Sequence, residues 1–506
     1  MTAAEQDSSI NKEMRVAVRH SAVYGLGTVL AKGLGFLMLP LYTHYLSPRD
    51  YGVLEMLDLT MTLIGMFLNM GITAALLRYY NIHKSTSERH KLVATAFLFV
   101  IGTGLATLLI AALLARPITT ALFSAAVPSI YFLISFSSST LGYITNVPNA
   151  YLQAKESSGM LVVADTLMLF GILLLNVYFI AIAQIGLVGV LLSPLLVGAI
   201  RACVFAWVTL REVGLKISMP RLREMVIFGA PLIFSNMAMF TLNFSDRFFL
   251  QHFQSLQTVG IYAVGYKFGF LLNVIAIQPF STMWQARMYL IEDRPGREKI
   301  FCRLFVFFSL TLIVGALALS LFGSEIITLM VDSRFTASKT VVPIIALAYV
   351  VYGIGYFLQA GLLMALRTRL IGALSAIAAL ANLGLNWALV PHFGMAGAAW
   401  STVLGFLVIG IGTCYFSWNA FATHLGVDRV LKALFIAGAL YFVSLALPVS
   451  MLGALILKGT LLVLFPVLLR AIHLLSGEEL ASLESVRQGA VSYTGRLLRL
   501  RGAENV

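Results

Sequence analysis

The chain has 506 residues, of which 59% are hydrophobic and 11% charged, with a mean hydropathy of +0.90 and a formal net charge of +13. This composition excludes an ordinary soluble domain, because too few polar residues remain to cover its surface. Apolar runs of roughly 20 residues or more are long enough to cross a ~30 Å hydrocarbon layer as helices. Their lack of alternation excludes a β-barrel.

Fourteen membrane-spanning helices are predicted, so the expected fold class is an all-α integral membrane protein. In chain order the spans lie near 17–46, 51–80, 90–114, 118–153, 157–183, 186–210, 223–252, 258–288, 301–323, 340–366, 370–391, 394–418, 429–449 and 453–474. The predicted domains are a cytoplasmic N-terminal segment (1–16), an N-lobe of six spans (17–210), a cytoplasmic linker (211–222), a C-lobe of six spans (223–418), two further spans (429–474) and a cytoplasmic amphipathic tail (475–506).

An internal repeat relates the two lobes. His44, Ser47 and Gly52 recur 208 residues later as His252, Ser255 and Gly260, and Gln153 recurs 206 residues later as Gln359. Homologous membrane halves are an architecture of transporters, in which the substrate site lies between the halves. With six spans in each half, both halves enter the membrane from the same side. We therefore expect two pseudo-symmetric lobes around a central cavity.

The positive charge follows the predicted topology. With the N-terminus inside and fourteen crossings, most of the 35 Lys and Arg residues fall on the cytoplasmic side. This asymmetry obeys the positive-inside rule and predicts that both termini are cytoplasmic. The basicity therefore gives no reason to expect nucleic acid as a partner.

Catalytic and metal-binding patterns are not found in the sequence. It has no Walker A sequence, HExxH motif or Ser/His/Asp grouping, and Cys203, Cys302 and Cys414 are far apart. We therefore expect that the protein is not an enzyme and that it holds no metal or other cofactor. A polysaccharide polymerase or ligase is a weaker alternative, because such an enzyme would be expected to carry a large external catalytic loop.

Charged residues within the spans are costly in hydrocarbon and are therefore candidate functional residues. The basic ones are Lys32, Arg201, Arg247, Lys267 and Lys458, and the acidic ones are Glu55, Asp58, Asp165 and Asp246. Lys32 lies near mid-depth of the first span among glycines, and we expect it to face the central cavity and attract an anion. The alternative is a lysine that snorkels or satisfies a helix carbonyl.

Opposite charges fall at symmetry-related positions in the outer half of the membrane. Glu55 and Asp58 lie one helical turn apart, and under the repeat Asp58 corresponds to the position beside Lys267, with Asp246 and Arg247 at similar depth. We interpret these residues as an outer gate, in which ion pairs between the lobes break when the outer side opens. Each pair would be worth ~0–1 kcal/mol where hydrated. The alternative is a structural network within one half.

Other polar residues each carry two interpretations. Asp165 and Arg201 are expected to pair within the first half, as a structural or a coupling pair. Arg78, at the end of the second span, either meets a phosphate at the cytoplasmic mouth or anchors the membrane interface with neighbouring tyrosines. Gln153 and Gln359 either bond a sugar or bond between helices.

Several short stretches carry a resemblance to a known family. They are LPLYTHYLSP at 39–48, YG at 51–52, ALLRYY at 75–80, YLQA at 151–154, DRFFL at 246–250 and VGIY at 259–262. In order and spacing they resemble the polysaccharide-transport flippases, including Wzx-type proteins, of the multidrug/oligosaccharidyl-lipid/polysaccharide (MOP) exporter superfamily. The resemblance covers residues 15–475.

The resemblance implies two six-helix lobes in a V, alternating access, and an undecaprenyl-diphosphate-linked oligosaccharide as cargo. It also implies a bacterial inner membrane location, with membrane lipids and polysaccharide polymerase or assembly proteins as further partners. Lys32, Arg247 and Lys267 would supply a cationic cavity for the diphosphate, and the last two spans a groove for the polyprenyl tail. Coupling to H⁺, Na⁺ or the membrane potential would drive transport.

The leading hypothesis is therefore a flippase that moves a lipid-linked oligosaccharide to the periplasmic leaflet for O-antigen, capsule or exopolysaccharide biosynthesis. The alternative is a cation-coupled multidrug or metabolite exporter of the same superfamily, which would use Glu55, Asp58 and Asp165 for coupling. The first span ends differently from that of the lipid II flippases, which argues against a peptidoglycan precursor as cargo.

Overall fold

A computed structural model describes residues 36, 38–123, 127–155, 157–292, 296–417, 425–447 and 451–472, and every regular element in these ranges is a helix. The first half contains α2 (Leu39–Tyr45), α3 (Pro48–Asn69), α4 (Ile72–Ile82), α5 (Thr86–Phe123), α6 (Ser129–Ala154), α7 (Ser158–Val177), η1 (Tyr178–Ile182) and α8 (Leu187–Val213). The second half contains α9 (Met219–Phe253), α10 (Leu256–Leu272), η2 (Asn273–Ile277), α11 (Gln278–Glu292), α12 (Arg297–Met330), η3 (Ser333–Thr340), α13 (Val342–Met364), α14 (Thr368–Ser417), α15 (Val427–Ala446) and α16 (Met451–Ala471). The predicted segments 1–16 and 475–506, and most of the first span, lie outside the described residues.

The predicted all-α membrane fold is confirmed, but the count of fourteen spans is not. Within the described ranges, ten helices are long and apolar enough to cross a membrane, or eleven if the bent α9 is one span. The predicted spans 370–391 and 394–418 both lie in α14, where two helices meet across a kink at Gly394, whose backbone is not helical (φ +53°, ψ −128°). The Ser-, Thr- and Asn-rich α6 is too polar to be counted among the ten.

The loop expected between 114 and 118 is wrong, because α5 continues through Pro117 to Phe123. A proline removes only its own N–H from the helix, and neighbouring membrane helices tolerate this loss. Ala115 and Phe123, on either side of Pro117, are buried in the core. Packing therefore keeps the helix intact past the proline.

The repeat encodes two matching helix starts. The Ser47 hydroxyl accepts a hydrogen bond from the Asp50 backbone N–H at 3.1 Å, and the Asp50 carboxylate accepts one from the Ser47 N–H, forming a capping box for α3. At the equivalent position in the second half, the Ser255 hydroxyl accepts from the Thr258 N–H at 3.1 Å and caps α10. The repeated serines thus fix where the two equivalent spans begin.

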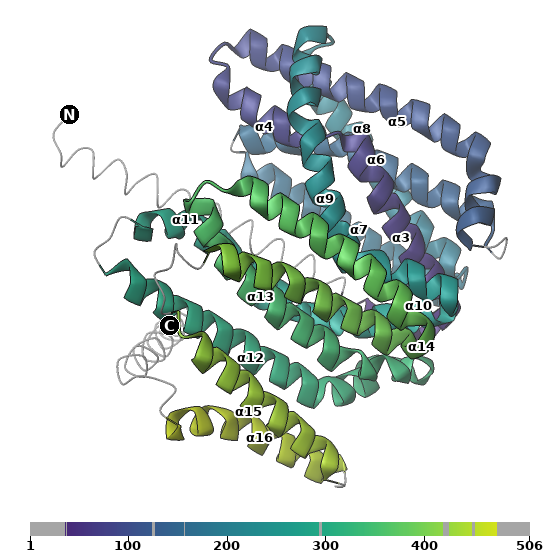
Figure 1. Ribbon diagram of the computed structural model, residues 1–506. Coiled ribbons are helices and arrows are strands. Elements are labelled where there is room, and N and C mark those ends of the chain that lie inside the picture. Colours follow the sequence, from purple (N-terminus) through teal and green to yellow (C-terminus); the bar gives the residue numbers. More distant parts are fainter. Residues whose placement is uncertain are drawn as a thin grey trace, which may run out of the picture.

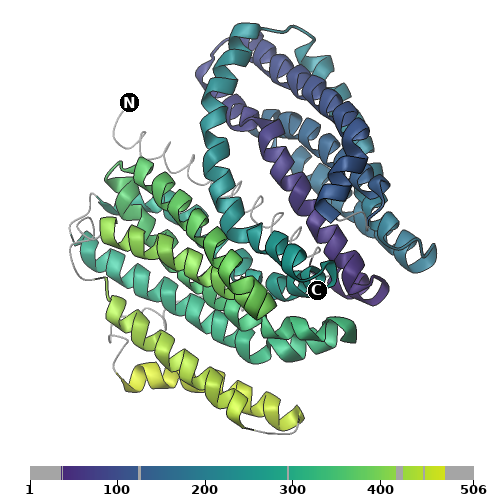
Figure 2. The ribbon, with the colours of Figure 1, turned by 45° about the vertical axis from the view of Figure 1, so that its right-hand side comes forward.

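The helices form two lobes that meet at one end and separate toward the other (Figures 1 and 2). In the N-lobe α6 packs between α5 and α8, and in the C-lobe α13 packs against α12 and α14. The α15–α16 pair packs on the outside of α12. We call the end where α3 and η3 meet α10 the convergent end, and the opposite end the divergent end.

The helix α9 begins against one lobe and ends in the other (Figure 2). It is bent by 49° between Met219–Pro231 and Asn236–Phe253, as expected where a proline lacks an N–H and crowds the preceding turn. Met225, in the segment of α9 before the bend, is buried in the apolar core of α4, α5 and α6. Leu242, in the segment of α9 after the bend, is buried in the larger hydrophobic core, which includes the C-lobe helices.

Candidate functional site

The closest approach of the two lobes is the crossing of α3 and α10. Gly52 and Gly260, which the repeat relates, lie directly against each other there. A Cβ on Gly52 would stand 1.8 Å from the Leu256 carbonyl oxygen, and one on Gly260 would stand 2.0 Å from the Pro48 carbonyl oxygen. Only glycine permits this backbone-to-backbone contact.

Beside this crossing, one carboxylate of the N-lobe reaches two cations of the C-lobe. Glu55 Oε2 lies 3.6 Å from Lys267 Nζ, and Glu55 Oε1 lies 3.8 Å from Arg247 Nε. The Arg247 side chain is 1% exposed and that of Glu55 12%, whereas that of Lys267 is 45% exposed. Lys267 is therefore the cation of this group that remains open to a further partner.

The C-lobe holds Arg247 in place through its neighbour Asp246. Asp246 Oδ1 accepts hydrogen bonds from the Arg247 backbone N–H at 2.9 Å and from Arg247 Nη1 at 2.8 Å. Its other oxygen accepts from the Tyr262 hydroxyl and from Thr402 Oγ1. The Arg247 guanidinium also lies 3.8 Å from the ring centroid of Tyr266. Asp246 thus belongs to a network within one half, and Arg247 joins that network to the N-lobe.

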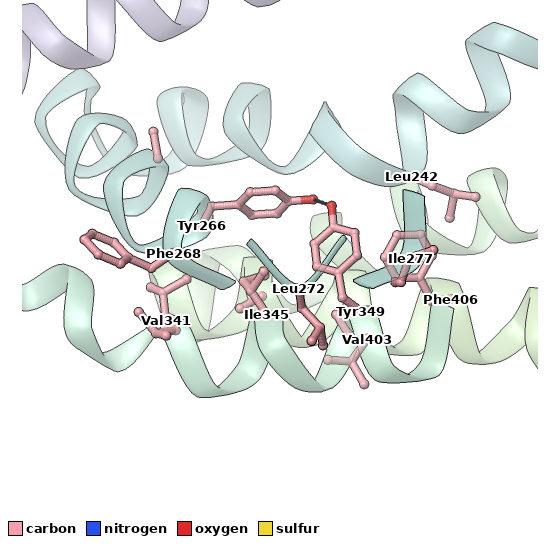
Figure 3. Close-up of a cluster of buried hydrophobic side chains, with 14 of the residues drawn as sticks. Leu242, Tyr266, Phe268, Leu272, Ile277, Val341, Ile345, Tyr349, Val403 and Phe406 are labelled. Atoms are coloured by element: carbon pink, nitrogen blue, oxygen red, sulfur yellow. Dashed lines mark hydrogen bonds between the residues drawn. The ribbon is translucent and has the colours of Figure 1, made fainter. Parts of the chain in front are cut away.

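A pair of tyrosines locks the helices that carry these charges. The Tyr266 and Tyr349 hydroxyls lie 2.7 Å apart, and Tyr349 donates to Asn243 Oδ1 at 3.0 Å. Figure 3 shows this hydroxyl pair surrounded by apolar side chains, among them Leu272 and Ile345. Hydrogen bonds in such low-dielectric surroundings are strong, so α9, α10 and α13 are held in fixed register.

Glu55, and not Asp58, is the residue that faces Lys267. Lys267 Nζ also donates to the Tyr51 hydroxyl at 2.7 Å. Asp58 is exposed, and its carboxylate has no ion pair within the described residues. It lies one turn farther along α3 from the Gly52 crossing than Glu55. Of the two candidate carboxylates on α3, Glu55 is therefore the one paired with cations of the other half, and a role of this contact as a gate stays a prediction.

A second contact between the lobes at the convergent end was missed by sequence reasoning. Arg334, in η3, donates through Nη2 to the carbonyl oxygens of Thr43 at 2.9 Å and His44 at 2.8 Å. Asp332 orients this arginine by accepting from its Nε at 2.8 Å. These hydrogen bonds hold the pKa of the Asp332 carboxyl below its usual value. The end of α2 is thereby bonded to the C-lobe.

At the divergent end the contacts join the first half of α9 to the N-lobe. The Arg78 guanidinium lies 4.6 Å from the ring centroid of Phe228, and the Ser218 N–H donates to Thr95 Oγ1 at 2.9 Å. Arg221 pairs with Glu88 at 3.4 Å. Arg78 therefore packs on an aromatic ring of α9, and both interpretations of this residue stay predictions.

The remaining predicted residues lie apart from the charges at the α3–α10 crossing. Asp165 pairs with Arg201 at 2.6 Å inside the N-lobe, and Arg201 also donates to Asn149. Gln153 is exposed on α6 and Gln359 is half-buried on α13. Lys32 lies outside the described residues. Within the described ranges, no three His, Cys, Asp or Glu side chains gather as a metal site.

Comparisons with solved structures show the same fold in membrane transporters. An inward-facing multidrug resistance MATE family transporter of the MOP superfamily is 14% identical, with a TM-score of 0.64 over 77% of this chain and 94% of that chain. The lipid II flippase MurJ, in an inward closed conformation, is 13% identical, with a TM-score of 0.58 over 90% of this chain and 99% of its own. The Vibrio cholerae MATE transporter VcmN, as a mutant, is 16% identical, with a TM-score of 0.54 over 82% and 97%.

The sequence also matches a family profile. No match is found among the curated proteins. The profile of a family described as "Polysaccharide biosynthesis protein" matches residues 17–284, which is more than half of the chain. The predicted family resemblance is confirmed: the chain is a multi-span membrane protein that belongs to the polysaccharide biosynthesis protein family.

Proposed function

We propose that the protein is a flippase that carries a polyprenyl-diphosphate-linked oligosaccharide from the cytoplasmic to the periplasmic leaflet of a bacterial inner membrane. The two lobes would alternate between states open to either side, with both termini cytoplasmic. The product would be O-antigen, capsule or exopolysaccharide. The family match and the transporter fold support this proposal.

The observation that carries the proposal is the half-exposed Lys267 side chain, whose ammonium lies between the lobes. A charge at such a place in a membrane protein is costly unless it meets water, a counter-ion or an anionic ligand. A diphosphate offers several charged oxygens, each a stronger acceptor than a carboxylate 3.6 Å away. We place Lys32, which we expect on the first span, in the same role.

This arrangement also connects cargo binding with gate opening. Glu55 and a diphosphate would compete for the same ammonium, because Lys267 is the open member of the three charges. A diphosphate on Lys267 would release Glu55 and weaken the contact between α3 and α10. At 3.6 Å the Glu55–Lys267 pair is long and its lysine is half-exposed, so we expect it to contribute only about 1 kcal/mol and to yield to a dianion.

The orientation follows from the basic residues. The α4 helix, which carries Arg78, and the starts of α9 and α12, which carry Arg221 and Arg297, lie toward the divergent end (Figure 1). We assign this end to the cytoplasm by the positive-inside rule. With the lobes in contact at the other end, the described conformation would be one that receives cargo from the cytoplasm.

A second candidate is a cation-coupled exporter of drugs or metabolites. The exposed carboxylate of Asp58, one turn from Glu55, supports it, because a cation or cationic solute would find an accessible acidic group there. The arrangement favours the flippase, since Glu55, one turn from Asp58, already faces two cations on α9 and α10.

The test is delivery of lipid-linked oligosaccharide across the membrane in cells depleted of this protein. Complementation would use the wild type, Lys267→Ala, Lys32→Ala and the control Lys432→Ala, which changes a lysine exposed on α15. We expect the wild type and the control to restore delivery and the other two to restore less than a tenth of it. Normal delivery in depleted cells that lack another flippase would overturn the proposal in favour of the exporter.

A further inference from the structure

The bend in α9 uncovers one face of the C-lobe. From Met219 to Pro231 the helix packs on the N-lobe, where Met225 is buried and Gly229 contacts Gly71. Only its second half packs along the C-lobe, where Tyr349 bonds to Asn243. Toward the divergent end, α11 and α13 therefore lie beside each other without α9 over them (Figure 1).

That face is polar and aromatic in composition. On α13, Tyr349, Tyr352, Tyr356 and Gln359 follow at intervals of three and four residues, the spacing of one helix face. The first of these is the buried partner of Tyr266, and the next three are half-buried. The face thus runs from the Arg247 network toward the divergent end.

The two helices are joined by one exposed amide. Gln285 on α11 is exposed, and its Nε2 donates to the Tyr356 hydroxyl at 2.9 Å. Thr282, one turn earlier on α11, is also exposed. The rings of Tyr352 and Tyr356 lie 6.4 Å apart at 41°, so they present a broad, tilted aromatic surface beside the amide.

These groups are suited to an uncharged, hydroxyl-rich ligand. An amide and phenol hydroxyls in contact with lipid would lose hydrogen bonds to water, whereas a sugar supplies both donors and acceptors. Tyrosine rings also match the apolar C–H faces of a sugar ring, and a tyrosine hydroxyl adds a polar contact at the edge. None of the side chains named on this face is charged. The part of the proposed cargo that fits it is therefore the carbohydrate and not the diphosphate.

We propose that Thr282, Gln285, Tyr352, Tyr356 and Gln359 form a carbohydrate subsite, separate from the diphosphate site at Lys267. The subsite rests on the proposed function and adds to it the residues that recognise the sugar. Eighteen residues of nearly continuous helix separate Lys267 from Gln285, which is about 27 Å at 1.5 Å per residue. Variants at the two places therefore change different contacts.

The experiment measures binding of two lipids to the purified full-length protein in lipid nanodiscs. One is lipid-linked oligosaccharide extracted from the cells that encode the protein, and the other is undecaprenyl diphosphate without sugar. The variants are Tyr356→Phe, which removes only a hydroxyl, and Gln285→Ala. Tyr415→Phe is the matched control, because Tyr415 is exposed on α14, outside this face.

We expect Tyr356→Phe and Gln285→Ala each to weaken binding of the oligosaccharide lipid roughly two- to tenfold, the effect of one hydrogen bond. Binding of undecaprenyl diphosphate should stay unchanged in both variants, which also shows that they are folded. Lys267→Ala should weaken binding of both lipids.

Three results would overturn the subsite. If both variants bind both lipids like the wild type, the subsite is wrong and the flippase proposal stands. If the variants lose both lipids equally, Gln285 and Tyr356 act through the fold and do not recognise the sugar. If the wild-type protein binds neither lipid, the proposed function itself fails.

Discussion

Gly52 and Gly260 occupy equivalent positions in the two halves of the chain and lie against each other where α3 crosses α10. A repeated sequence position has thus become a self-complementary contact between the lobes. Because the two backbones are so close, a single added methyl group should force the lobes apart at the convergent end. A substitution here is therefore a direct way to shift the protein from a closed toward an open convergent end.

The first prediction concerns this crossing. Gly52→Ala would place a Cβ 1.8 Å from a backbone carbonyl oxygen, which only separation of the helices relieves. Overpacking of this kind costs about 1–3 kcal/mol, which corresponds to a roughly 5- to 150-fold shift away from the closed convergent end. The measurement is the yield of a thiol cross-link between Tyr45→Cys and Ser333→Cys, in a protein without its three native cysteines. Gly142→Ala, whose Cβ meets nothing within 4 Å, is the control, and an equal yield in both variants would contradict the prediction.

The second prediction concerns Glu55. Glu55→Gln keeps the side-chain shape but removes the negative charge that faces Lys267 and Arg247. At these distances we expect a loss of about 1 kcal/mol of closed-state stability and a lower yield of the same cross-link. High salt should reduce the yield in the wild type more than in the variant. Asp58→Asn, one turn away, should give the same cross-link yield as the wild type. If its yield fell as far as that of Glu55→Gln, the assignment of the pairing to Glu55 alone would be wrong.

The third prediction concerns pH at the convergent end. Arg334 holds the pKa of the Asp332 carboxyl below its usual value of about 4. A lowered carboxyl pKa adds stability above the unfolded-state value, and this stability is lost as pH falls through the lower folded-state value. The distance between spin labels on Tyr45→Cys and Ser333→Cys should therefore be constant between pH 8 and pH 5; a cross-link yield is unsuitable here, because thiol reactivity itself changes with pH. Arg334→Ala should lengthen this distance across that whole range, whereas Lys339→Ala should not; a wild-type transition near pH 6 would show that another group controls the contact.

The fourth prediction concerns the first half of α9. The Ser218 N–H lies 2.9 Å from Thr95 Oγ1, so Thr95→Cys and Ser218→Cys should form a disulfide on mild oxidation. Thr103→Cys, about 12 Å farther along α5, should form none with Ser218→Cys. Absence of the first disulfide would show that this half of α9 does not rest on the N-lobe in the membrane.

Much of the architecture was predictable because hydrocarbon imposes a simple rule on sequence. Long apolar runs located the helices, and the cost of buried charge singled out Glu55, Arg247 and Lys267. The pairing of these charges was less accessible, because it depends on the rotation and crossing of α3 and α10. The sequence named both Glu55 and Asp58, and only the structure shows that Glu55 is the one paired with Lys267.

Other features left weaker signals in the sequence. Arg334 resembled a solvated loop residue, and only the fold brings it to the carbonyl groups of Thr43 and His44. The docking of α9 on the N-lobe depends on the direction of a bend at Pro231, which composition does not specify. The helix α5 continued through Pro117 because packing outweighed one missing hydrogen bond.

The bridging position of Glu55 has an electrical consequence. Together, the Glu55 and Asp246 carboxylates balance the Arg247 and Lys267 cations, so this group of four charges is neutral while the lobes are in contact. Separation of the lobes would leave a net positive charge on the C-lobe side and a negative charge on the N-lobe side. We therefore expect an empty protein to resist opening at this end, because each separated charge loses its counter-ion.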